Sequence, residues 1–257
     1  MHFARLHHQA EPLLLANVWD VASARAAKAA GYATIGTSSA AIADMLGYAD
    51  GEGVSFAELK ALVARLRAAA DLPLTVDMEA GYGETAGTVV ANLRELAALG
   101  VVGVNLEDSV VRNGQRTLSD AEAFARRLRD IHAGLQAAGV ELFVNVRTDA
   151  FLLGIANARA ETIARGQSYA ACGADGLFVP CVTDEADIAA IVAGVSLPLN
   201  VMCMPNLPSF ERLAALGVKR ISMGNFLHGR VQQTLRQLFD AVRDEQSFRA
   251  LFDHAGH

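Results

Sequence analysis

Acidic side chains and one arginine follow three successive apolar segments. Asp77 lies at the end of segment 72–78 and Glu79 directly follows it, and Glu107 and Arg147 lie near the ends of the next two segments. Side chains alternate along a strand, so Asp77 and Glu79 point the same way. Converging carboxylates repel one another unless a cation neutralises them, and Mg²⁺ prefers oxygen ligands. The spacing therefore predicts a Mg²⁺ site, with Mn²⁺ as the alternative ion, beside an arginine suited to a substrate carboxylate.

Two further acids, Asp108 and Asp149, lie next to these residues. A single carboxylate at a strand end commonly caps a helix or forms an ion pair. We therefore interpret Asp108 and Asp149 as structural residues that connect neighbouring loops.

Eight apolar segments alternate with stretches of helical spacing that are rich in Ala, Leu and Arg. Continuous apolar runs are typical of parallel strands that are covered on both faces. Eight βα units in 257 residues predict one α/β domain, residues 1–257, folded as a (β/α)8 TIM barrel. An open doubly wound sheet is the alternative. The segments are 13–18, 32–37, 72–78, 102–108, 142–148, 176–181, 197–203 and 220–225.

Composition argues against several classes of protein. The chain has 22 Lys and Arg, 28 Asp and Glu, a net charge of −6 and no basic block, so we expect no nucleic acid or membrane partner. Its three widely spaced cysteines match neither a disulfide framework nor a zinc site. The first residues lack a signal peptide's apolar stretch, and we expect them, with His2, His7 and His8, to form a flexible terminus of a cytoplasmic protein.

The C-terminal helical region, about 226–257, carries two apolar stripes. A monomeric barrel is expected to cover the first stripe, whereas the second has no obvious partner within one chain. This favours burial of the second stripe against another subunit; the alternative is a tail folded back on its own barrel. The first stripe is Leu227, Val231, Leu235, Leu238 and Val242, and the second is Phe248, Leu251 and Phe252.

Several short motifs occur in one order from about residue 14 to about residue 231. With these motifs, the chain resembles the isocitrate lyase/phosphoenolpyruvate mutase superfamily. They are Asn17-Val18-Trp19-Asp20, Ser23-Ala24-Arg25, Ala30-Gly31-Tyr32, Asp77-x-Glu79-x-Gly81-Tyr82-Gly83, Leu106-Glu107-Asp108 and Arg147-Thr148-Asp149-Ala150.

The resemblance implies a metal site and a homotetramer. It implies Mg²⁺ held directly by Asp77, with Glu79 and Glu107 acting through waters and Asp50 near those waters. Superfamily members usually carry Asp where this chain has Glu79. The resemblance also implies that C-terminal helices are exchanged between the subunits.

The resemblance further implies a bound 2-oxo carboxylate. Groups around Ser38, Ser39 and Ala40 would hold its carboxylate, with Arg147 as the second anchor. At the end of segment 197–203, Asn200 is predicted either to contact the substrate or to brace a loop.

The proton donor is open among three candidates. These are Tyr48, Tyr82 and a metal-bound water. We place Tyr48 in the predicted catalytic set with Asp50, Glu107 and Arg147.

The sequence departs from the superfamily pattern at two places. The loop 109–117, which we expect to close over the site, lacks the Cys and His of isocitrate and methylisocitrate lyases, so we exclude both activities. Pro180 or Cys181 stands where phosphonopyruvate enzymes carry His or Glu, which weakens the case for P–C chemistry.

The expected function is therefore a Mg²⁺-dependent lyase. It would cleave a C–C bond of a small, oxaloacetate-like 2-oxo or 2-hydroxy di- or tricarboxylate through a metal-stabilised enolate. Two alternatives stay open. One is P–C chemistry on phosphonopyruvate by a mutase or hydrolase, and the other is a barrel that binds a 2-oxo acid without turning it over.

Overall fold

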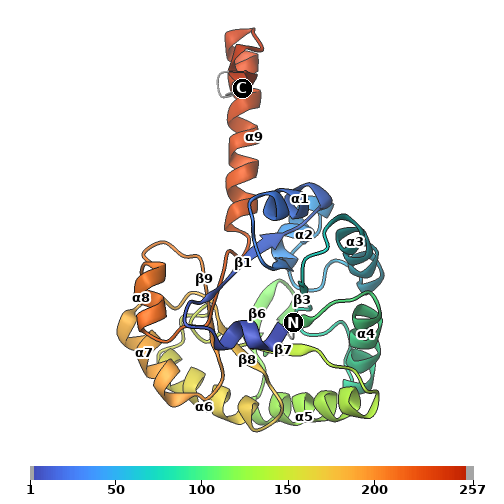
Figure 1. The fold of residues 1–257 in the computed structure, drawn as a ribbon, viewed down its shortest axis with the longest axis vertical. Helices are drawn as coiled ribbons and strands as arrows, with labels where there is room; N and C mark the ends of the chain where they lie inside the picture. The colour runs from blue at the N-terminus through green and yellow to red at the C-terminus, as the bar shows by residue number, and fades with distance from the viewer. Residues whose placement is uncertain (1–2, 253–257) are drawn as a thin grey trace.

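The eight apolar segments form a closed barrel of parallel strands in the computed structural model, which describes residues 3–252 (Figure 1). The order around the barrel is β1-β10-β9-β8-β7-β4-β3-β2, and β1 closes it by pairing with both β10 and β2. This confirms the predicted (β/α)8 fold. The strands are β1 (Leu13–Val18), β2 (Ile35–Thr37), β3 (Leu74–Asp77), β4 (Gly103–Glu107), β7 (Phe143–Arg147), β8 (Gly176–Val179), β9 (Leu199–Met202) and β10 (Arg220–Ser222).

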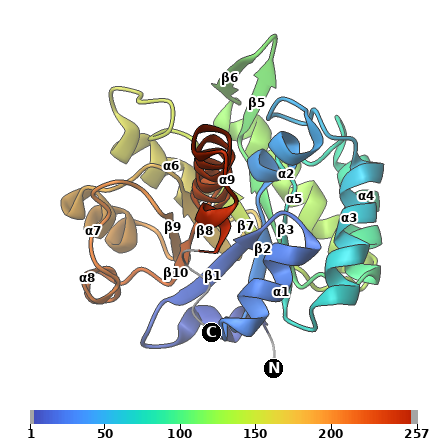
Figure 2. The same cartoon turned by 90° about the horizontal axis from the view of Figure 1, so that it is seen from above.

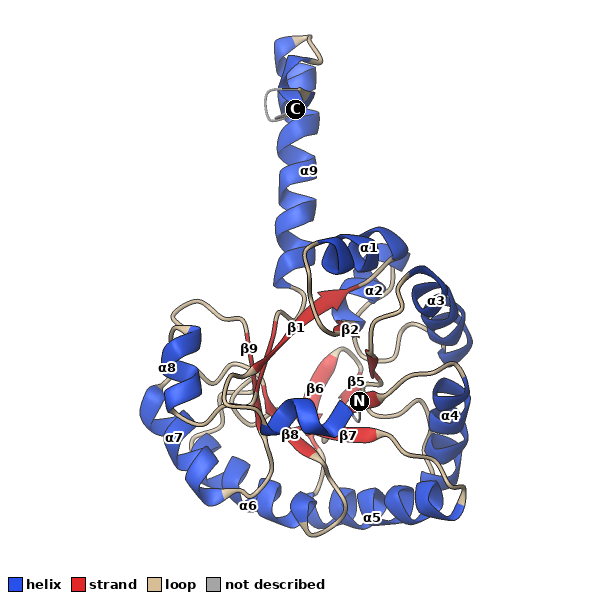
Figure 3. Ribbon diagram, in the orientation of Figure 1, coloured by secondary structure: helices blue, strands red, loops and turns tan. Residues whose placement is uncertain are grey.

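Helices surround the barrel, and most begin at a residue whose side chain caps the first turn (Figure 3). Ser55 and Glu58 form a reciprocal capping box at the start of α3, for example. The helices are α1 (Val21–Ala29), α2 (Ser39–Leu46), α3 (Phe56–Ala69), α4 (Ala86–Ala98), α5 (Ala121–Ala137), α6 (Ala158–Ala170), α7 (Glu185–Gly194), α8 (Phe210–Ala215) and α9 (Phe226–Glu245). No helix within residues 3–252 is both long enough and apolar enough to span a bilayer.

The barrel interior contains a polar layer as well as apolar side chains. The Asn145 amide donates hydrogen bonds to Asn105 Oδ1 at 2.9 Å and to Asn200 Oδ1 at 3.1 Å. All three side chains are buried, and they belong to β7, β4 and β9. Mutual hydrogen bonding satisfies these amides, which makes their burial tolerable.

The N-terminal segment corrects one expectation, because His7 does not lie in a flexible terminus. It belongs to the 3₁₀ helix η1 (Phe3–His8), and its ring is stacked on Phe143 with centroids 4.1 Å apart. Phe3 meets Phe143 edge-on, and Phe3, Leu13 and Phe143 form a small apolar cluster. The segment is therefore part of the packed structure. Apolar contacts from a single turn have no periodicity that a sequence pattern can reveal.

The expected lid, 109–117, is a hairpin rather than an irregular loop. Strands β5 (Ser109–Arg112) and β6 (Gln115–Leu118) pair antiparallel and project from the barrel beside α2 (Figure 2). The connecting residues Asn113 and Gly114 have φ of 53° and 74°, as a tight two-residue hairpin turn requires.

Helix α9 corrects a second expectation, because the barrel does not cover its first apolar stripe. The helix extends away from the barrel (Figure 1), and within it only His228 is buried. Leu227, Val231 and Leu235 are each more than 40% exposed. Beyond it, η2 (Arg249–Leu251) follows Phe248, and both Phe248 and Phe252 are exposed. Both stripes are therefore open within one chain.

Candidate active site

A cavity of about 400 Å³ lies at the carboxyl ends of the barrel strands. Its size is that of a small-molecule site. Its wall combines charged side chains with apolar ones such as Leu152, Leu153 and Phe178. Of the predicted site residues, it contains Ser38, Ser39, Ala40, Asp50, Asp77 and Arg147.

Asp77 ends β3 and faces the beginning of α2. Its Oδ2 accepts hydrogen bonds from the Ser39 backbone N at 3.2 Å and from Ser39 Oγ at 2.8 Å. Ser38 is the N-cap of this helix, and Ala40 completes the wall. Because the positive end of the helix dipole favours anions, this corner can hold a carboxylate beside Asp77.

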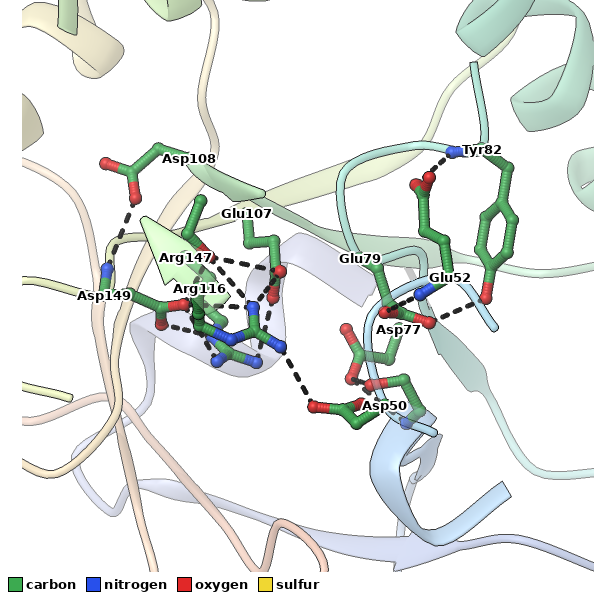
Figure 4. Close-up of polar contacts among 12 residues, drawn as sticks. Asp50, Glu52, Asp77, Glu79, Tyr82, Glu107, Asp108, Arg116, Arg147 and Asp149 are labelled. Carbon is green, nitrogen blue, oxygen red and sulfur yellow. Dashed lines mark hydrogen bonds and ion pairs between the residues drawn. The ribbon is translucent and has the colours of Figure 1, made fainter. Parts of the chain in front are cut away.

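Glu79 lies just beyond β3 with a positive φ of 47° (Figure 4). Its Oε2 accepts from the Glu52 backbone N at 2.5 Å, and its Oε1 accepts from the Tyr82 hydroxyl at 2.9 Å. Burial raises the pKa of Glu79 to about 7, and the charges of Asp77 and Asp50 act in the same direction. Asp77 and Asp50 thus add to the cost of ionising the buried Glu79 carboxyl.

Glu107 ends β4 and is buried between two arginines. Its Oε1 accepts hydrogen bonds from Arg116 Nη1 and from Ser109 Oγ, and its Oε2 lies 3.1 Å from Arg147 Nη1. Glu79 and Glu107 together line an adjoining cavity rather than the one lined by Asp77. The two cavities therefore divide the three predicted metal-binding acids.

Arg147 ends β7 and is held by carboxylates. Its Nε and Nη2 donate to the two oxygens of Asp149 at 2.6 and 3.0 Å. Its guanidinium also lies 5.9 Å from the centre of the Phe178 ring. A guanidinium has five N–H groups, and the contacts with Asp149 and Glu107 engage three of them, so donors are left for a ligand.

Arg116 belongs to this site, although the sequence did not single it out. From β6 it reaches Asp50 Oδ2 at 3.0 Å and Asp149 Oδ2 at 3.3 Å, and it contacts Glu107 (Figure 4). It also lines the cavity. Because side chains alternate along a strand, Arg116 and Leu118 both turn inward from β6. This alternation could have indicated Arg116 from the sequence, but only if residues 109–118 were already known to form a hairpin.

Asp108 and Asp149 are both fully buried, and their contacts link neighbouring elements. Asp108 accepts hydrogen bonds from the Tyr169 hydroxyl at 2.7 Å and from Arg165 Nη1 at 3.0 Å. Asp149 orients Arg147 and Arg116. These contacts support the structural interpretation of both acids.

Two of the predicted site residues, Tyr48 and Asn200, do not line the cavity that contains Asp77 and Arg147. The Tyr48 hydroxyl donates to Glu58 Oε1 at 2.8 Å, and Tyr48 is exposed and does not line the cavity. Asn200 is buried, and its amide donates to Val201 O at 2.7 Å and to Ser222 Oγ at 3.1 Å. The structure therefore places Asn200 in the polar layer of the barrel interior and Tyr48 beside α3.

The donor set fits a divalent cation held partly through water. Within residues 3–252, no three His, Cys, Asp or Glu side chains converge closely enough to enclose a metal ion by themselves. Asp77 and Asp50 nevertheless act on Glu79 through their charges, which contribute, after burial, to its raised pKa. Carboxylate oxygens with waters between them suit Mg²⁺, which retains part of its hydration shell.

Comparison with known proteins adds sequence relatives and similar folds. Residues 3–243 match the family model described as phosphoenolpyruvate phosphomutase. An uncharacterised Mycobacterium tuberculosis protein is 33% identical over 88% of this chain and 82% of its own length. The oxaloacetate decarboxylase of Ectopseudomonas mendocina is 30% identical over 90% of this chain and 79% of its own length.

Solved structures agree with this assignment. A Burkholderia cenocepacia J2315 protein provisionally named a phosphonomutase has a crystal structure with a TM-score of 0.86 to this one. The two sequences are 39% identical, and the match covers 93% of this chain and 97% of that chain. An oxaloacetate acetylhydrolase structure shares the fold at 21% identity, with a TM-score of 0.86 over 96% of this chain and 87% of that one. With the strand-end acids in place on a closed barrel, the chain belongs to the phosphoenolpyruvate phosphomutase family.

Proposed function

We propose that this protein is a lyase that cleaves a C–C bond of a small 2-oxo or 2-hydroxy di- or tricarboxylate. The observation that carries the proposal is the cavity in which Asp77 and the beginning of α2 lie with Arg147 and Arg116. Acidic groups for a cation and basic groups for carboxylates are thus combined in one space. Relatives about 30% identical that are named oxaloacetate decarboxylases support this substrate class.

Asp77 would hold the divalent cation directly, with Glu79 and Glu107 reaching it through water. A cation there supplies Lewis-acid stabilisation of negative charge on a substrate oxygen. Mg²⁺ is the proposed ion and Mn²⁺ the alternative.

The chain's own groups bind and orient the substrate. The first turn of α2, at Ser38 to Ala40, receives one carboxylate through backbone N–H groups. Arg147 is held in one orientation by Asp149, so its remaining donors are directed before the substrate binds. Arg116 connects the hairpin to Asp50 and Glu107, which keeps the hairpin beside the cavity and limits access of water.

P–C chemistry on phosphonopyruvate is the second candidate function. The match to the phosphoenolpyruvate phosphomutase model favours it. Against it, Pro180 lines the cavity near the end of β8, and a prolyl ring offers no proton donor or acceptor. We therefore rank it below C–C cleavage.

We also propose that the protein is a homotetramer in which α9 packs on other subunits; the exposure of α9 supports an interface on this helix. Val231, Leu235 and Phe239 recur every four residues along one face of α9 and are 43% to 66% exposed, and Phe248 and Phe252 beyond the helix are 68% and 70% exposed. Contiguous exposed apolar surface of this kind marks interfaces. Light scattering coupled to size-exclusion chromatography should give four times the mass of one chain, and a monomer would contradict this.

Proton NMR tests the proposed function directly. The protein is incubated with Mg²⁺ and a panel of oxaloacetate, isocitrate, 2-methylisocitrate and other branched 2-hydroxy and 2-oxo acids, and ³¹P NMR follows phosphonopyruvate. Samples without protein correct for slow decarboxylation of oxaloacetate by Mg²⁺ alone. Protein-dependent, EDTA-sensitive consumption of one acid supports the lyase. Consumption of phosphonopyruvate alone supports the second candidate, and line broadening of one acid without consumption would indicate a binding protein.

A further inference from the structure

Arg220 is a buried cation at the inner end of the candidate cavity. It begins β10 and is 1% exposed, yet it lines the cavity with Leu15, Asn105 and Ser222. Its Nη2 donates to Thr75 Oγ1 at a long 3.4 Å. Thr75 precedes Asp77 by two positions on β3, so both side chains point into the barrel and Thr75 lies one layer deeper. Arg220, which contacts Thr75, therefore lies deeper in the barrel than Asp77.

The rest of the Arg220 guanidinium has no protein partner. Nε and Nη1 are buried and make no hydrogen bond to any described residue. Among residues 3–252, no carboxylate lies within ion-pair distance of it. An unpaired buried charge is costly, and an anionic ligand would remove that cost.

The other two arginines of the cavity differ from Arg220 in this respect. Arg147 contacts Asp149 and Glu107, and Arg116 contacts these acids and Asp50. Burial lowers the pKa of Arg220 to about 10, although the more distant charge of Asp77 acts in the opposite direction, so Arg220 still carries its charge at neutral pH. Of the three arginines that line this cavity, Arg220 is therefore the one whose charge has no carboxylate at ion-pair distance among the described residues.

We infer that Arg220 forms an anion subsite that binds a second carboxylate of the substrate at the floor of the cavity. The inference rests on the proposed function, because it assigns a residue to the far end of the same substrate. A guanidinium with two free N–H directions matches a carboxylate in a fixed geometry. A free inorganic anion is the alternative ligand that the Arg220 guanidinium could bind.

The test compares two ligands that differ only in the distal carboxylate, 2-oxoglutarate and 2-oxopentanoate. Calorimetry with the Mg²⁺-loaded protein gives both dissociation constants, and turnover is not needed. We expect wild type to prefer the diacid by at least about tenfold. Arg220→Met should weaken diacid binding by at least about tenfold and monoacid binding by less than threefold, and Arg220→Lys should retain part of the preference.

Arg67→Met is the matched control. Arg67 also has a buried, unpartnered Nε, but it lies outside the cavity and donates from Nη1 to Leu72 O. This variant should leave the diacid preference unchanged. If Arg220→Met lost affinity for both ligands equally, or kept the wild-type preference for the diacid, the proposed subsite would be overturned.

A measurement on the wild-type protein decides the matter if Arg220→Met does not fold. Crystals soaked in 2-oxoglutarate should show a carboxylate oxygen within hydrogen-bond distance of Arg220 Nε or Nη1. A carboxylate bound elsewhere would overturn the inference. Anomalous scattering from crystals soaked in bromide can show whether a bromide ion binds at Arg220. A bromide ion there that 2-oxoglutarate does not displace would also overturn the inference, because it would indicate a site for inorganic anions. If the diacid binds at Arg220 but no acid is consumed, the subsite stands and the proposed lyase activity fails.

Discussion

Arg116 Nη2 lies 3.0 Å from Asp50 Oδ2, so an ion pair joins the hairpin β5–β6 to the loop that follows α2. The same guanidinium contacts Glu107 and Asp149. One side chain thereby connects the hairpin to two strand ends and to a loop of the site. The packing of Gly51 is also close, because a Cβ added there would lie 2.6 Å from Val111. The hairpin is therefore fitted to the site rather than loosely placed over it.

Arg116→Gln should free the hairpin and lower kcat/KM by about 10- to 100-fold, because small displacements of positioning groups have effects of this size. Hydrogen exchange should accelerate in residues 109–118. Arg112→Gln on the same hairpin is the control, since Arg112 is exposed and does not line the cavity that contains Asp77 and Arg147. Equal activity of the two variants would contradict a role for Arg116.

His7 should make folding stability depend on pH. Burial lowers its pKa to about 3, with Arg220 acting in the same direction, against 6.5 when unfolded. The unfolded chain therefore binds the proton more readily, and stability is lost as pH falls from about 6.5 toward 3. At pH 5 this loss is about 2 kcal/mol.

His7→Phe should remove this pH dependence while keeping the stacking on Phe143. Urea unfolding at pH 7 and pH 5 measures the difference in the free energy of unfolding. His8→Phe is the control, because His8 is exposed. A wild-type protein that loses no more stability between these pH values than His7→Phe would show that His7 is not buried as a neutral ring.

Asp108→Asn should destabilise the protein without weakening metal binding. The substitution removes the buried carboxylate partner of Arg165 and leaves it only the partly exposed Glu161, and breaking a buried pair costs about 3 kcal/mol or more. Thermal unfolding and Mn²⁺ titration measure the two properties separately. A large loss of Mn²⁺ affinity in the folded variant would assign Asp108 to the metal site.

Much of the fold and part of the site can be predicted from the sequence. Continuous apolar runs identify the barrel strands because both strand faces are buried. The order of strands then places Asp77, Glu107 and Arg147 at one end of the barrel. The involvement of Ser38 to Ala40 comes only from the resemblance to the superfamily, and the sequence alone does not predict the helix α2 that begins at Ser39.

The remaining features depend on tertiary contacts that leave no periodic signal. His7 is buried by a single 3₁₀ turn stacked on Phe143, which is more than a hundred residues distant in sequence. Arg220 and Arg116 are charged residues on short strands, where burial depends on the register of neighbouring strands. Helix α9 carries a clear apolar stripe, but a stripe does not say whether its own barrel covers it.

We expect that a cation held by Asp77 is needed for cleavage of the substrate. The most direct measurement compares wild type with Asp77→Asn, using Mn²⁺ affinity from electron paramagnetic resonance and the rate of acid consumption from NMR. Asp71→Asn, at an exposed site, is the control. We predict Mn²⁺ binding at least about tenfold weaker and a rate reduced by about 1,000-fold or more in Asp77→Asn. An Asp77→Asn protein that binds Mn²⁺ and consumes the substrate like wild type would contradict the account.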